Sequence, residues 1–185
     1  VRFEGVDGKV TKVITNKREI EADLVILAIG VSPNTEIAVE AGIECDKRGA
    51  IKVNDHFQTS DPAIYSGGDC VTIPNLVTGK LGYYPLGSMA NRQGRIIGTN
   101  LAGGDASMAG GIGSWCVKLF EMSCSGAGLT LEQALANDFD AISVHVEQMD
   151  RAHFFPEKAL MSLQIVVDRP SRRILGMQGM NEFGD

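Results

Sequence analysis

The chain lacks the features of a membrane protein and of a nucleic-acid-binding protein. No apolar run approaches the roughly 20 residues that a membrane-spanning helix requires, and the first residues lack the charged-then-apolar order of a signal peptide. The formal net charge is -6, and the only cluster of basic residues (Arg169, Arg172, Arg173) lies around an expected turn. We therefore expect a soluble, cytoplasmic protein with no nucleic acid and no membrane among its partners.

Metal-ligand spacing is also lacking. The cysteines form no C-x-x-C pair and are not spaced with the three histidines as metal ligands are. We interpret all four as reduced structural thiols (Cys45, Cys70, Cys116, Cys124). No metal site is predicted, and a catalytic role for Cys124 would need a measured thiol pKa.

The first half of the chain has an α/β pattern. A hairpin is predicted around residues 6–9, because Asp-Gly tolerates the positive φ angles of tight turns. Residues 22–29 are apolar almost throughout, as in a parallel strand covered on both faces, and Gly30 closes this run. The pattern then predicts a short helix over 34–41 with Asn34 as its cap and strands over 51–53 and 63–66. A loop over 70–85 and a helix from Ser88 to about residue 102 complete this half.

The second half has an antiparallel α+β pattern. Strands are predicted over 115–120 and 141–148, a short helix capped by Thr130 over 130–136, and a hairpin over 160–180. The boundary between the two halves is predicted near residue 106, within a Gly-rich link over residues 102–113.

The stretch "AIYSGGDC", residues 63–70, gives the clearest chemical signal. Ligands of open α/β sheets lie beyond the carboxyl ends of strands, so Asp69 is a candidate ligand-binding residue. The two glycines allow a close backbone approach, and a carboxylate suits a hydroxyl-bearing ligand but repels phosphate. The expected helix start at Ser88 offers free N–H groups to an electron-rich part of the same ligand. Taken alone, G-G-D is equally compatible with a plain surface turn.

Several motifs together resemble one family. "TSDPAIYSGGDC" followed by "PLGSMANRQGRIIGTNLAGG" resembles the second flavin-binding segment of the pyridine nucleotide-disulfide oxidoreductases, and the coenzyme A-disulfide reductase, NADH oxidase and polysulfide reductase branch is the most similar. "ADLVILAIGVSPNTEIAVEAGI" is similar to the end of that family's NAD domain, and "GSWCVKLF", "GLTLEQA" and "ILGMQG" to its dimerisation domain. The resemblance spans nearly the whole chain.

The resemblance implies a fold, cofactors and site residues. The fold is an α/β fragment, with the end of an NAD(P)-binding domain over 1–30 and the second half of an FAD-binding domain over 31–105. An α+β dimerisation domain with an antiparallel sheet, truncated at its C-terminus, follows over 106–185. The cofactors are FAD and NAD(P)H, and the partners are a second copy of the chain and a small-molecule disulfide or polysulfide. The implied cofactor-binding residues are Gly68 and Asp69 on the ribityl chain, Leu86, Gly87 and Ser88 along the flavin's pyrimidine edge, and Ile29 and Gly30 near the nicotinamide nucleotide.

The family reaction implied is electron transfer from NAD(P)H via FAD to a disulfide, CoA-disulfide, polysulfide or oxygen. The family's first G-x-G-x-x-G motif and its redox cysteine are not matched here, so we expect a C-terminal fragment without a catalytic residue of its own and inactive by itself. His153 and Glu157 are interpreted as surface residues, while Phe154 or Phe155 could reach a partner's active site. The alternative is a non-catalytic dimerisation or interaction module.

Overall fold

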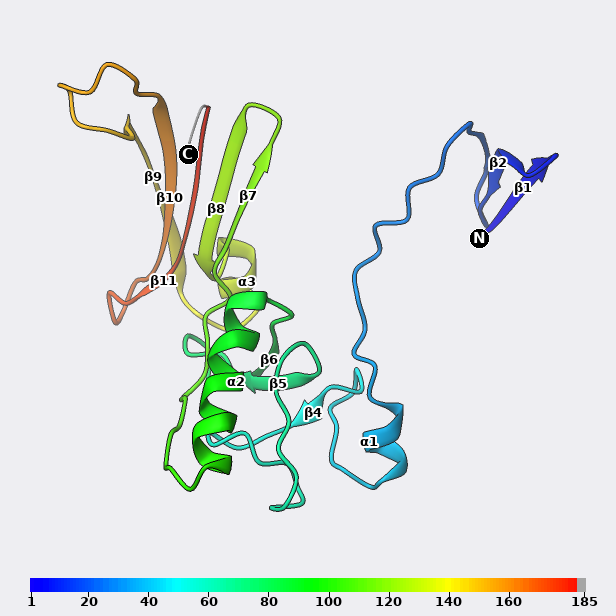
Figure 1. Cartoon of the computed structure of the whole chain (residues 1–185). Helices are drawn as coiled ribbons and strands as arrows, with labels where there is room; N and C mark the ends of the chain where they lie inside the picture. The colour runs from blue at the N-terminus through cyan, green and yellow to red at the C-terminus, as the bar shows by residue number, and fades with distance from the viewer. Residues whose placement is uncertain (183–185) are drawn as a thin grey trace. The chain divides into compact units, whose positions relative to one another are not determined.

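The computed structural model (Figure 1) describes residues 1–182, which divide into two compact units, the first over residues 1–32 and the second from residue 33 onward. Within the described range, no helix combines the length and the apolar character that crossing a membrane requires.

The first unit is a three-stranded antiparallel sheet. Its strands are β1 (Arg2–Val6), β2 (Lys9–Ile14) and β3 (Glu19–Glu21), in the order β1-β2-β3. Asp7 and Gly8 both have positive φ, 52° and 76°, at the β1–β2 turn. This turn confirms the predicted hairpin, because Asp-Gly supplies the conformation that the turn requires.

The predicted buried strand over residues 22–29 is wrong. These residues form no helix or strand, and their apolar side chains face solvent, with Ile26 80% and Ile29 89% exposed. A parallel strand needs a hydrogen-bonded neighbour and cover on both faces. The first unit offers neither to this segment, since its sheet ends at β3.

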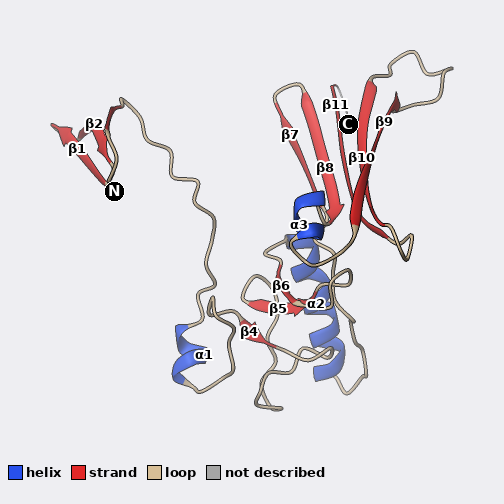
Figure 2. Ribbon diagram, turned by 180° about the vertical axis from the view of Figure 1, so that it is seen from behind, coloured by secondary structure: helices blue, strands red, loops and turns tan. Residues whose placement is uncertain are grey.

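The first part of the second unit is a small sheet covered by a long helix (Figure 2). Its elements are α1 (Glu36–Glu40), β4 (Ile51–Lys52), β5 (Val71–Pro74), β6 (Leu81–Tyr83) and α2 (Gly87–Leu101). β4 pairs with β5 in parallel and β5 with β6 antiparallel. Val71 and Ile73 of β5 pack with Met89 of α2 and the fully buried Phe57, which gives this part its own hydrophobic core.

Four local predictions in this part are wrong. Residues 63–66 form no strand and make only an isolated bridge between Tyr65 and Gln58. The predicted loop over 70–85 contains β5 and β6, because the β-branched Val71-Thr72-Ile73 run pairs with both neighbours. The N-cap of α1 is Thr35 rather than Asn34, and the N-cap of α2 is Leu86 rather than Ser88.

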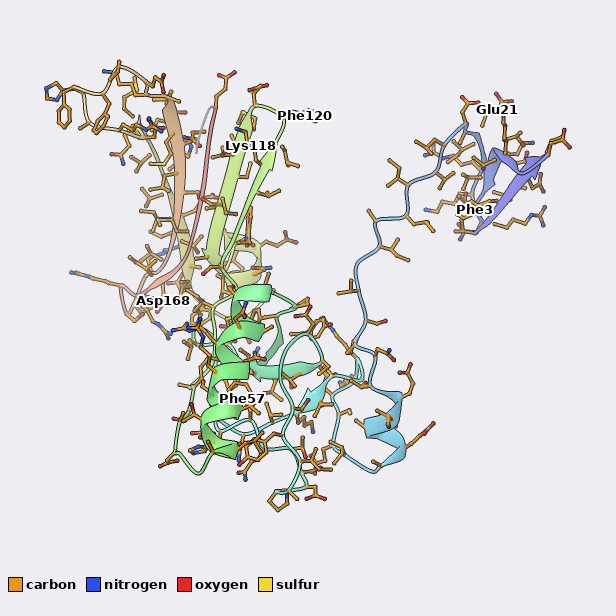
Figure 3. All side chains as sticks on the ribbon, viewed as in Figure 1. Phe3, Glu21, Phe57, Lys118, Phe120 and Asp168 are labelled. Carbon is orange, nitrogen blue, oxygen red and sulfur yellow. The ribbon has the colours of Figure 1, made fainter. Side chains whose placement is uncertain are left out.

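The last part of the second unit is a five-stranded antiparallel sheet in the order β7-β8-β11-β10-β9. Its elements are β7 (Trp115–Leu119), β8 (Met122–Gly128), α3 (Leu131–Leu135), β9 (Ala141–Met149), β10 (Leu160–Asp168) and β11 (Ile174–Glu182). The predicted strands and the β10–β11 hairpin around Asp168 are confirmed, and β8 was missed (Figure 3). β8 was missed because its alternation is hidden by Gly126, Gly128 and two serines.

The two faces of this sheet differ. One face packs at its end against α3, where Ala134, Ala141, Val166 and Leu175 form a second core. The opposite face presents a group of partly exposed apolar side chains to solvent, and we call this group the apolar sheet face: Ile142, Val144, Val146 and Met177. In the described part of the chain no helix covers it.

The start of α3 has a complete capping box, as the sequence predicts. The hydroxyl of Thr130 accepts the N–H of Gln133, and the Gln133 side chain accepts the N–H of Thr130. We expect Thr130→Ala to lower the free energy of unfolding by about 1 kcal/mol. Chemical denaturation would measure this loss, and Thr130→Ser should retain most of the stability. An alanine variant as stable as the wild type would contradict the role of the cap.

Candidate functional site

The turn formed by residues 66–70 packs against helix α2. The N–H of Gly68 donates to Oε1 of Gln93 at 2.6 Å, and Gln93 is buried in α2 with only 1% of its surface exposed. A Cβ atom added to Gly67 would lie 2.6 Å from Cδ1 of Ile97, so the end of the Ile97 side chain would have to move to admit one. Gly68 has φ +87° and lies close to Ala90 of the same helix face. The two glycines thus allow the turn to lie directly on α2.

The side chain of Asp69 is exposed to solvent next to this contact with α2. Its main-chain oxygen accepts the hydroxyl of Tyr83, on β6, at 2.8 Å. No hydrogen bond or ion pair engages its carboxylate within residues 1–182. The carboxylate is therefore free to accept hydrogen bonds from a ligand, while the backbone that carries it is fixed.

The position of Asp69 in the sheet differs from the prediction. Asp69 precedes β5 instead of following a strand, because residues 63–66 are not a strand. The argument from the carboxyl end of a strand is therefore wrong. The Gly67-Gly68 turn that precedes Asp69 contacts the first three turns of α2, through Ala90, Gln93 and Ile97.

The start of α2 is open. Leu86 is the N-cap and makes no side-chain cap hydrogen bond, while its carbonyl accepts the N–H groups of Met89 and Ala90. Gly87 and Ser88 are exposed, and a Cβ atom added to Gly87 would meet nothing within 4 Å. The N–H groups of Gly87 and Ser88 and the positive end of the helix dipole are thus available to an electron-rich group.

A groove of about 640 Å³ begins next to these residues. Tyr83, Tyr84 and Leu86 line one side, and Trp115 and Gln178 of the C-terminal sheet line another. The pKa of Tyr83 is raised, chiefly by burial and then by the nearby charge of Asp69. Burial also raises the pKa of Tyr84, although a hydrogen bond from Asn75 works in the opposite direction. Both tyrosines therefore remain neutral donors at physiological pH.

The other predicted site residues lie elsewhere or have ordinary contacts. Ile29 and Gly30 belong to the first unit, so their role at a nicotinamide nucleotide stays a prediction. In the C-terminal sheet, His145 is hydrogen-bonded to Ser162, and the ring of His153 packs edge-on against Phe154. Gly94 and Gly98 of α2 have nothing within 4 Å of an added Cβ atom.

Sequence reasoning missed Gln93 and the hydrogen bond from Tyr83 to the Asp69 carbonyl. The signal for Gln93 was present, since a polar residue falls on the face of α2 that buries Met89, Ile96 and Ile97. A buried amide needs a partner, and the glycines of the motif are the nearby backbone that can provide one. No comparable pattern pointed to Tyr83, because β6 itself was not predicted.

Comparison with known proteins shows which family the chain is similar to. The family model described as pyridine nucleotide-disulphide oxidoreductase matches residues 1–94, just over half of the chain. The chain is similar to an NAD(P)H sulfur oxidoreductase (CoA-dependent) of Pyrococcus abyssi, with 34% identity over 97% of this chain and 40% of the relative. It is also similar to an NADH oxidase of Enterococcus faecalis, with 34% identity over 95% of this chain and 39% of the relative.

A solved structure is more similar still. The crystal structure of an FAD-dependent pyridine nucleotide-disulphide oxidoreductase from Desulfovibrio vulgaris has 62% identity and a TM-score of 0.85, over all of this chain and 44% of that one. The chain thus spans about two-fifths of the length of the proteins it matches. By the match of its first 94 residues, the chain belongs to the pyridine nucleotide-disulphide oxidoreductase family.

Proposed function

We propose that the chain is part of an FAD-dependent NAD(P)H oxidoreductase that passes electrons to a disulfide, CoA-disulfide, polysulfide or oxygen. The observation that carries this proposal is the free, exposed carboxylate of Asp69 on a turn fixed against the start of α2. The names of the relatives support the reaction class, because they include an FAD-dependent family member, a CoA-dependent sulfur oxidoreductase and an NADH oxidase.

The residues present fit a flavin. Asp69 accepts hydroxyl groups of the ribityl chain, and Gly68, which has no side chain, leaves room beside it. Gly87 and Ser88 offer backbone N–H groups, and with Leu86 they offer an open surface, to the electron-rich edge of the ring. Bound FAD supplies the hydride and electron chemistry, which side chains cannot perform by themselves.

The proposal is tested by the protein expressed from its complete reading frame. That protein should purify with bound FAD, absorb near the wavelengths of a flavin and oxidise NADH or NADPH anaerobically with bleaching of the flavin. A protein that contains no flavin and takes none up from solution would overturn the proposal. Comparison of polysulfide, CoA-disulfide and oxygen as acceptors under one set of conditions then identifies the substrate.

We also propose that the sheet formed by β7 to β11 makes a homodimer through the apolar sheet face. Val144 is 47% exposed and has Val146 and Met177 as partly exposed apolar neighbours on the same face. Most oligomers of soluble proteins are symmetric, and an uncovered apolar patch is typical of an interface.

Val144→Lys should therefore convert the dimer to a monomer, because it places a charge in the apolar interface. Sedimentation of the wild type and of the variant measures the change. His145→Lys, on the opposite face of β9, is the matched control and should remain dimeric. If Val144→Lys sediments as the wild type does, this face is not the interface.

The same face is what favours the second candidate function, a dimerisation or interaction module without a redox centre. The two functions differ in the flavin, which only the oxidoreductase requires. A cytoplasmic location is part of the proposal and stays a prediction.

A further inference from the structure

The turn that carries Asp69 is held from two elements. Gln93 of α2 accepts the N–H of Gly68 at 2.6 Å, and Tyr83 of β6 donates to the carbonyl of Asp69 at 2.8 Å. The thiol of Cys70 also donates to the carbonyl of Gly67, at 3.4 Å. These bonds hold the Gly67–Gly68 peptide, which precedes Asp69 by one residue, and the Asp69–Cys70 peptide, which follows the Asp69 Cα atom.

Gln93 differs from Tyr83 in its surroundings. It is 1% exposed and lies among apolar residues, so water does not compete with its side-chain carbonyl for the N–H of Gly68. If the Gln93 acceptor is removed, the partly buried N–H of Gly68 is left without a partner. Movement of the turn away from α2 then lowers the free energy, because it exposes this N–H to water. Asp69 would then move relative to the start of the helix.

We propose that Gln93 is a positioning residue for the flavin: it holds the Gly67–Gly68 peptide, next to Asp69, on α2, so that the Asp69 carboxylate and the open helix start bind one ligand together. The proposal rests on the proposed function and adds a residue to it. Gln93 itself contacts no ligand, and all of its effect passes through Asp69.

The test is a double-mutant cycle on FAD binding. Apoprotein made from the complete reading frame is titrated with FAD, and binding is followed by quenching of flavin fluorescence. Gln93→Met keeps the size of the side chain and removes the acceptor, so we expect Kd to rise about tenfold, equivalent to about 1.4 kcal/mol. In an Asp69→Ala background the same substitution should change Kd by less than about twofold, because the residue through which Gln93 acts is absent.

Asn100→Leu is the matched control. Asn100 is also a half-buried amide on α2, and it bonds the backbone of His56 and Ala106 at the other end of the helix. Its loss should lower the apoprotein Tm as Gln93→Met does, but leave the FAD Kd unchanged. Should Gln93→Met fail to fold, Tyr83→Phe takes its place in the cycle, with an expected rise in Kd of about threefold that is also absent in the Asp69→Ala background.

The outcomes separate this inference from the proposed function. Equal penalties in both backgrounds, or no penalty from Gln93→Met, overturn the positioning role while FAD binding by the wild type stands. A wild type that binds no FAD, or an Asp69→Ala variant with unchanged Kd, overturns the proposed function itself.

Discussion

Replacing Asp69 by alanine is expected to weaken FAD binding by about 10- to 100-fold, the loss that corresponds to one or two hydrogen bonds to a charged acceptor. The carboxylate is exposed and makes no structural hydrogen bond or ion pair in the described part of the chain. Its removal should therefore leave the apoprotein Tm almost unchanged. Equilibrium titration with FAD and a thermal melt of the apoprotein measure the two quantities separately.

Two variants sharpen this prediction. Asp69→Asn keeps the shape but loses the charge, so its Kd should fall between those of the wild type and the alanine variant. Asp105→Ala removes another highly exposed acid, beyond the far end of α2, and should bind FAD as the wild type does. Wild-type affinity in Asp69→Ala would show that this acid is part of an ordinary surface turn.

The second large effect is expected at Gly176, on β11. A Cβ atom added there would overlap the main-chain atoms of Leu129, which follows β8, so the two segments would have to separate. We expect Gly176→Ala to lower the free energy of unfolding by about 3 kcal/mol, at the upper end for an overpacked site. The neighbouring core residue Leu175 would be displaced as well.

Gly179→Ala is the control on the same strand. Its added Cβ atom would approach only the end of the Leu163 side chain, at 3.3 Å, which can rotate away. The midpoint of chemical denaturation should shift far less than for Gly176→Ala. Similar midpoints for the two variants would contradict the steric argument.

The sequence predicted elements whose signals are local. The Asp7-Gly8 turn and the Thr130 cap depend on residues within one turn of each other, and both are confirmed. The alternation of Ile142, Val144 and Val146 likewise identified β9 without knowledge of its neighbours. These features need no tertiary context.

The errors arise where long-range contacts decide. The apolar residues 22–29 have the composition of a buried strand but no sheet to join, so composition alone misleads. The sequence pattern predicts the strand next to Asp69 at residues 63–66. The strand is Val71–Pro74 instead, because only this segment pairs with β4 and β6. The partner of Gln93 was likewise a matter of long-range contact, because Gly68 lies 25 residues earlier in the chain.

The uncovered segment that includes Ile26 and Ile29 has a practical consequence for handling residues 1–185 as an isolated polypeptide. A run of β-forming apolar side chains without charge and with unpaired main-chain groups readily pairs with copies of itself, and aggregates grow from such contacts. A shorter polypeptide that starts at Pro33 omits the run, so it should remain clear at concentrations where the longer one precipitates.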